Sequence, residues 1–138
     1  MPTATYNKYT AAIAPLLEGI NSGSDSWKIA LAATVNAADT TFTPGTSDLA
    51  TGNGYTAGGN AATVSSHAQT SGTYKLVLAS PATWTATGAG FTFRYAIMWD
   101  STTSTPVAYW DYGSSQTVAA GETVTVTLDA TNGVFQAT

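Results

Sequence analysis

The chain contains no cysteine among its 138 residues. Disulfide bridges and metal sites built on thiolates are therefore excluded, and folding in a reducing cytoplasm is compatible with the composition. Charge is also scarce, because Asp, Glu, Lys and Arg together make up 9% of the residues, against roughly a quarter in an ordinary soluble domain. Threonine, serine, asparagine and glycine supply the polarity instead, so separate copies repel one another only weakly.

Basic residues are the rarest of the charged types. The four present, Lys8, Lys28, Lys75 and Arg94, are scattered along a chain of net charge −4. Nucleic-acid binding needs clustered Lys and Arg side chains that neutralise phosphates. We therefore expect neither a nucleic acid nor an anionic membrane surface as a partner.

Long apolar runs are missing as well. No stretch approaches the roughly 18 apolar residues of a membrane span, and residues 1–10 lack the basic start and apolar run of a signal peptide. We expect a protein that is made and folded in the cytoplasm.

The apolar content is nevertheless sufficient for a core. Hydrophobic residues make up 43% and aromatic residues 11% of the chain, which excludes a disordered protein and fits one domain at this length. We divide the chain into an N-terminal helical arm, residues 1–25, and a β domain, residues 26–138.

The arm is predicted from spacing. Apolar residues recur every three or four positions, as on one face of a helix, and Thr5 is a suitable N-cap. Pro15 conflicts with a continuous helix because it removes an amide donor, so two short helices, or one that starts near Ala14, are alternatives. The apolar positions are Tyr6, Tyr9, Ile13, Leu16, Leu17 and Ile20.

The rest of the chain has the alternation of β-strands. The strongest case is Phe91–Trp99, where aromatic and aliphatic residues occupy every second position. Gly113–Gln116 is predicted to turn the chain. Short strands joined by Gly- and Ser-rich turns favour an antiparallel β-sandwich or jelly roll. Further strands are predicted at Trp27–Leu31, Thr73–Ala79, around Trp84, Val107–Tyr112, Glu122–Leu128 and Val134–Gln136.

A Gly- and Asn-rich segment, Thr43–Gly59, has few strand-forming residues and is predicted to be a long loop that serves as a binding arm. It lacks the Gly-Lys-Ser/Thr ending of a phosphate-binding loop. Its glycines are expected to allow turns or a close backbone approach to a neighbouring subunit.

No residue pattern points to catalysis or to a metal. His67 is the only histidine and lies beside Ser65 and Ser66, without a Gly-x-Ser-x-Gly elbow or thiolate partners. Asp100 and Asp111 could flank one connection and act as a glycosidase pair or help to bind calcium. We favour solvated loop carboxylates, and we expect no enzyme activity, no cofactor and no metal.

The aromatic segment Tyr109–Tyr112 has three possible uses. Stacking on sugars, burial in the core and a subunit interface would all employ Tyr and Trp side chains. On a strand Tyr109 and Asp111 share one face, and Trp110 and Tyr112 share the other. We favour core plus interface over sugar binding.

Seven short pieces of the sequence are distinctive when they are taken in order. They are Asn53–Gly59, Thr70–Leu76, Trp84–Thr85, Phe93–Ala96, Trp110–Ser115, Gly121–Thr123 and Asn132–Val134. In this order they resemble a group of small virion structural proteins of tailed bacteriophages. The resemblance covers roughly residues 6–138 and implies a particle component without catalytic residues.

The expected function is capsid decoration, or cementing, on the outer face of the virion. The major capsid protein would be the partner, and residues 1–25 and Thr43–Gly59 would make the contacts. Self-association is expected, with a trimer as the first hypothesis. The alternatives are a tail, baseplate or fibre-associated protein that binds a host glycan or receptor, and a carbohydrate-binding module. The residues expected at the interface are Tyr6, Tyr9, Ile13, Asn53, Tyr55, Tyr109, Trp110 and Tyr112.

Overall fold

The computed structural model describes residues 3–138. The fold is mainly β, with antiparallel sheets and one short helix, which confirms the predicted class. The elements are β1 (Thr5–Lys8), α1 (Ile13–Glu18), β2 (Trp27–Ala32), β3 (Asn60–Ala61), β4 (Val64–Thr70), β5 (Thr73–Leu78), β6 (Trp84–Thr85), β7 (Phe91–Asp100), β8 (Thr105–Val118), β9 (Thr123–Val124) and β10 (Phe135–Ala137).

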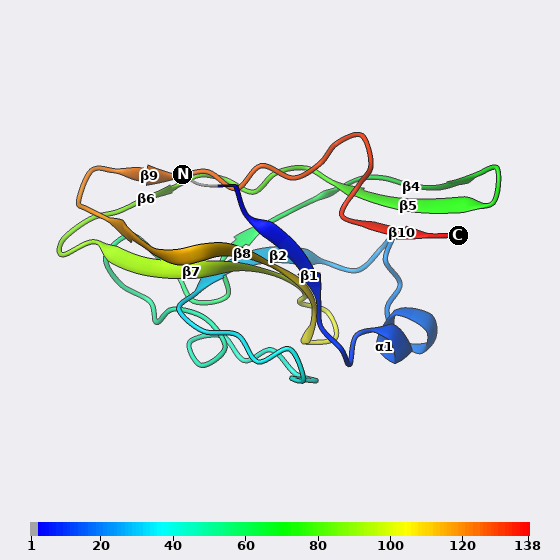
Figure 1. Ribbon diagram of the computed structural model, residues 1–138, viewed down its shortest axis with the longest axis horizontal. Helices are drawn as coiled ribbons and strands as arrows, with labels where there is room; N and C mark the ends of the chain where they lie inside the picture. The colour runs from blue at the N-terminus through cyan, green and yellow to red at the C-terminus, as the bar shows by residue number, and fades with distance from the viewer. Residues whose placement is uncertain (1–2) are drawn as a thin grey trace.

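A five-stranded sheet in the order β1-β8-β7-β2-β3 forms the middle of the molecule (Figure 1). The long strands β7 and β8 are paired from Phe91 opposite Val118 to Asp100 opposite Thr105. Their central residues are buried because both faces of the sheet are covered. Near-continuous apolar runs are typical of strands in that position.

The layer above the middle sheet contains a sheet in the order β10-β5-β4 and the pair β6-β9 (Figure 1). Val124, Val126 and Leu128 are buried, and the threonines between them are exposed. The predicted alternation over Glu122–Leu128 is therefore confirmed. Only Thr123 and Val124 of this run form ladder pairs, opposite Thr85 and Trp84.

The layer below is irregular and comes from residues 33–59. Phe42 stacks on Trp99 with ring centroids 4.1 Å apart, and Tyr55 is only 2% exposed. The Tyr55 hydroxyl donates to the Asp48 carboxylate and accepts from the backbone amide of Leu31 on β2. The segment Thr43–Gly59 is thus a loop, as predicted, but its large side chains pack into the core.

The glycines of Thr43–Gly59 were expected to allow turns or a close backbone approach to a neighbouring subunit. In the structure Gly59 makes such an approach to β2 of the same chain. At Gly59, whose φ is +74°, a Cβ atom would lie 1.9 Å from the carbonyl oxygen of Ile29. Only glycine fits at this position, because the loop returns directly against β2.

The helix predicted from residue 6 is wrong in its first half. Thr5–Lys8 is a strand that pairs with Ala108–Asp111 of β8, and the helix covers only Ile13–Glu18. Pro15 is the third residue of that helix, where the backbone amide has no intrahelical acceptor. The alternative of a helix that starts near Ala14 is therefore the closer one.

Two further differences concern strands. Gly113–Gln116 was predicted to be a turn, but β8 continues through it to Val118. The continuation is possible because Gly113 adopts a φ of +81° and the register shifts between Phe93 and Tyr95 on β7. Strand β4 was not predicted at all.

Candidate docking groove

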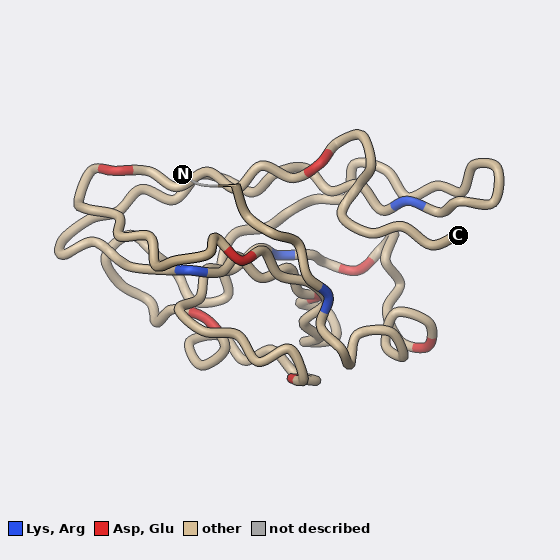
Figure 2. Tube along the Cα trace, in the orientation of Figure 1, with Lys and Arg blue, Asp and Glu red and all other residues tan. Residues whose placement is uncertain are grey.

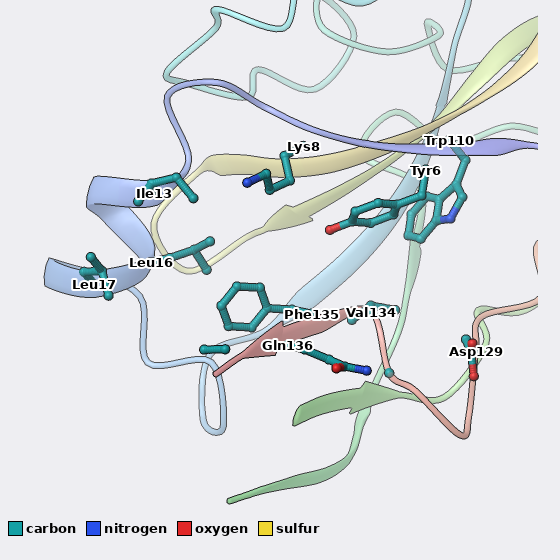
Figure 3. Close-up of a pocket in the computed structure, with 12 residues that line it drawn as sticks. Tyr6, Lys8, Ile13, Leu16, Leu17, Trp110, Asp129, Val134, Phe135 and Gln136 are labelled. Atoms are coloured by element: carbon teal, nitrogen blue, oxygen red, sulfur yellow. The ribbon is translucent and has the colours of Figure 1, made fainter. Parts of the chain in front are cut away.

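A groove of about 570 Å³ lies where the N-terminal segment meets the C-terminal strand (Figure 3). It opens between β1 at the edge of the middle sheet and β10 at the edge of the upper sheet, with α1 at one end. Most of the lining is apolar. The lining residues are Tyr6, Lys8, Ile13, Leu16, Leu17, Trp110, Asp129, Gly133, Val134, Phe135, Gln136 and Ala137.

Strand alternation places the first wall. Tyr6 and Lys8 are two residues apart on β1, so both side chains lie on the same face. Tyr6 is opposite Trp110 of β8, and the two rings meet edge to face with centroids 5.6 Å apart. Tyr6 stays 41% exposed, so it is available to a partner. Its partial burial raises the pKa of the phenol, which keeps the group neutral.

Helix α1 supplies the end of the groove. Ile13, Leu16 and Leu17 are spaced three and four residues apart, so their side chains lie on the same side of this short helix. Ile13 is 45% and Leu17 81% exposed, and with Tyr6 they are the exposed large hydrophobic residues of the described chain. Such residues gathered at one groove are typical of an interaction surface.

The opposite wall comes from residues 133–137. Val134 is buried, whereas Phe135 is half-buried and faces Tyr74 of β5 with centroids 6.3 Å apart. The backbone amide of Val134 donates to the carbonyl of Leu76, which holds this wall against β5.

Two charged groups border the groove. Asp129 accepts hydrogen bonds from the backbone amides of Thr131 and Asn132 and from the Asn132 side chain. The bonds from Asn132 lead the causes that lower the pKa of Asp129, so this carboxylate stays ionised. Lys8 points into the groove from the other wall (Figure 3). The site is therefore an apolar surface with one cation and one anion.

The structure brings together only three of the residues expected at an interface. Tyr6, Ile13 and Trp110 line the groove. Asn53 is exposed on the loop before β3, where its side-chain oxygen accepts from the Ala89 amide at 3.4 Å. It does not line the groove.

The other four expected interface residues have intramolecular partners. Tyr9, Tyr55 and Tyr112 are 3%, 2% and 9% exposed, so they belong to the core of the single chain. Tyr109 is half-buried between the rings of Tyr9 and Tyr95. Burial raises the pKa of Tyr9 and Tyr55 above the ordinary tyrosine range.

Asp100 and Asp111 do not share a site. Asp100 ends β7 and is fully buried, where its carboxylate accepts from the Thr102 amide and the Thr103 hydroxyl. Asp111 lies in the middle of β8 and accepts two hydrogen bonds from Arg94. The expectation of solvated loop carboxylates is wrong for both residues, because strand pairing brings each one to its own donors.

Burial raises the pKa of Asp100, with a further contribution from the carboxyl group of Asp25. The Arg94 guanidinium lowers the pKa of Asp111. His67 is exposed on β4. Within residues 3–138, no group of three or more His, Asp or Glu side chains gathers where it could hold a metal ion.

The sequence reasoning missed the C-terminal wall of the groove. Val134–Gln136 was predicted to be a closing strand, and that strand is present as Phe135–Ala137. No local pattern, however, indicated that it would lie across a groove from β1. The sequence also carried no signal that Leu17, which lies on the predicted apolar face, would stay exposed at the groove.

No family model, no curated protein and no solved structure matches this chain. In the part of the chain that the structure describes, no helix is long and apolar enough to cross a membrane.

Proposed function

We propose that this chain is a structural component of a tailed-bacteriophage particle, and that it decorates the outer face of the capsid. The observation that carries the proposal is the apolar groove at the N-terminal segment. Tyr6, Ile13 and Leu17 stay exposed there, whereas the other large hydrophobic side chains of the described chain are buried or partly buried. The sequence resemblance supplies the biological setting, and the groove supplies a contact for a protein partner.

The proposed mechanism is burial of this apolar surface against the major capsid protein. Leu17 contributes most, because at 81% exposure nearly all of its side chain is available for burial. The scarcity of charge also favours dense coverage of a shell, since many copies can stand side by side with little mutual repulsion.

Binding to shells tests the groove directly. Particles that lack this chain would be incubated with the purified protein and sedimented. We expect the wild type to sediment with the shells, and we expect retention of Leu17→Asp to fall at least tenfold. Ala120→Asp is the matched control, since it adds the same charge at an exposed position of the turn between β8 and β9, and this turn lies at the opposite end of the molecule from α1 (Figure 1).

The Leu17 substitution is preferable to removal of residues 1–20. Tyr9 and Ala12 are buried, and β1 covers one edge of the middle sheet. A truncated chain would therefore lose core as well as surface. Equal shell binding by wild type and Leu17→Asp would remove the groove from the proposal.

The alternative is a tail or fibre-associated protein that binds a host glycan at the same groove. It is favoured by the rings of Tyr6, Trp110 and Phe135 beside the polar groups of Lys8 and Gln136. Flat rings with nearby hydrogen-bonding groups suit a sugar. Binding of the purified protein to host-cell polysaccharide, abolished by Trp110→Ala, would favour this alternative.

A further inference from the structure

We infer that the free edge of β4 is a pairing surface for a second copy of this chain. The inference goes beyond the proposed function and does not use the groove. It rests on an exposed strand edge whose residues are complementary to themselves when two copies meet antiparallel.

Strand β4 is the outer strand of its sheet, because the order is β10-β5-β4. From Ser65 to Thr70 every residue is exposed, and the hairpin that β4 forms with β5 extends beyond the body of the molecule (Figure 1). Among the described residues, β4 has no backbone hydrogen bonds other than those with β5. An unpaired edge of this kind is a template for another strand.

The turn between β4 and β5 determines which backbone groups face outward. Ser71 and Gly72 have φ angles of +50° and +82°, as in a two-residue type I′ turn. Thr70 and Thr73, which flank this turn, therefore form a hydrogen-bonded pair. By alternation Ala68 and Ser66 also bond toward β5, and the amides and carbonyls of His67 and Gln69 point to the free edge.

In one antiparallel register of two β4 strands, the outward backbone amides and carbonyls of His67 and Gln69 all find partners. This register also avoids the irregularity between Val64 and Ser66. It places the two-fold axis at Ala68. His67 of one copy then exchanges backbone hydrogen bonds with Gln69 of the other, and Ser66 lies opposite Thr70. The two copies of Ala68 meet at the closest approach, where a small side chain fits.

The charges favour a second copy as the occupant. No Asp, Glu, Lys or Arg lies on β4, and Lys75 is the charged residue on the hairpin (Figure 2). A partner strand without charge can pair with this edge without burying an unpaired charge, and β4 of a second copy is such a strand. Lys75 lies opposite Ala68 on β5, so in the pair the two lysines would be separated by three strand spacings, or roughly 14 Å. Salt screens charges at that distance.

The side chains that would meet are also complementary. Ser66 and Thr70 would join hydroxyl to hydroxyl across the two strands, a pairing that stabilises sheets. The imidazole of His67 is already packed against Gly23 of its own chain, so the His67–Gln69 pair contributes through its backbone hydrogen bonds. The arrangement is two-fold, and it therefore differs from the trimer expected from the sequence.

Charge substitutions test the register. In Ser66→Lys/Thr70→Lys each lysine would face a lysine of the other copy, whereas in Ser66→Lys/Thr70→Glu each would face a glutamate. Sedimentation velocity should give twice the single-chain mass of 14.1 kDa for the wild type and for the Lys/Glu variant. The Lys/Lys variant should give the single-chain mass, with an unchanged circular dichroism spectrum.

Disulfide trapping gives a second readout, because the chain contains no other cysteine. Ala68→Cys should cross-link to the same residue of a second copy on mild oxidation. Thr70→Cys is the control: it is exposed on the same strand but lies opposite Ser66, so it should not cross-link. A wild type that stays at the single-chain mass, a Lys/Lys variant that keeps the double mass, or equal cross-linking of both cysteine variants would overturn the inference.

Discussion

Arg94 and Asp111 face each other across β7 and β8 and form a bidentate ion pair. The Nε and Nη2 atoms of Arg94 donate to the two carboxylate oxygens of Asp111 at 2.8 and 3.0 Å. The guanidinium also lies over the ring of Tyr95, 5.2 Å from its centroid. The pair bridges the strands next to the register shift between Phe93 and Tyr95, where regular ladder pairing is interrupted.

This geometry predicts that the protein becomes less stable in acid, and that part of the loss comes from protonation of Asp111. Hydrogen bonds from Arg94 and from the Gly113 amide lower the pKa of Asp111 below its ordinary value of 3.8. The contribution of the ionised Asp111 to the free energy of unfolding is therefore present above pH 3.8, and it is lost as the pH falls through the folded-state pKa. Asp111→Asn should melt below the wild type at neutral pH, and the difference should shrink in acid. A difference that is independent of pH would contradict this assignment.

Asp100 should have the opposite dependence. Its pKa is raised, first by burial and then by hydrogen bonding and repulsion involving Asp25. The folded state therefore binds the proton more tightly than the unfolded state, and stability is lost as the pH rises from 3.8 through the folded-state pKa. Asp25→Asn removes the neighbouring charge, so it should raise the melting temperature at neutral pH and have little effect in acid. A lower melting temperature at neutral pH would contradict this prediction. It would show that the hydrogen bond from the Asn21 amide to the Asp25 carboxylate, 2.8 Å long, stabilises the fold more than the repulsion between Asp25 and Asp100 destabilises it.

Tyr55→Phe should lower the free energy of unfolding by about 1–3 kcal/mol, since it leaves the buried Leu31 amide without its acceptor and removes one of the two donors to the Asp48 Oδ2 atom, which keeps the Gly58 amide. The ring and its packing against Trp84 are kept. Urea denaturation measures the change. Tyr6→Phe is the control, because its hydroxyl makes no hydrogen bond within the described chain and its ring is part of the exposed groove. Equal stability of Tyr55→Phe and the wild type would show that the hydroxyl does not hold the loop.

Gly59→Ala should destabilise the fold by at least about 2 kcal/mol, because the new methyl group would overlap the backbone of Ile29 and the residue must adopt a positive φ. Gly72→Ala separates these two causes. Gly72 has a similar φ of +82°, but no atom lies within 4 Å of its Cβ position, so the change should cost only about 1 kcal/mol, for the left-handed conformation alone. Similar losses for the two variants would refute the close approach of the loop to β2.

The sequence predicted the parts of the fold in which local pattern and tertiary burial agree. Phe91–Trp99 alternates strongly, and the strand formed there lies at the centre of the middle sheet. Thr5–Lys8 was mistaken for helix because Tyr6, Tyr9 and Ile13 have helical spacing. A strand, a turn and a short helix in succession satisfy the same spacing, and only pairing with distant β8 distinguishes them.

Strand β4 escaped prediction for a related reason. Its residues from Ser65 to Thr70 are all exposed, so no apolar alternation marks them, and the strand depends on the Ser71-Gly72 turn and on β5. The groove was predictable only in part. Tyr6, Ile13 and Trp110 were named from the sequence, but Phe135 comes from the other end of the chain, and no local signal brings the two ends together.

The most direct test of the proposed function is cryo-electron microscopy of particles that carry this chain. We expect its density to repeat over the outer face of the shell, with the groove around Leu17 turned toward the major capsid protein. Density confined to the tail, the baseplate or the fibres would contradict capsid decoration and would favour the glycan- or receptor-binding alternative.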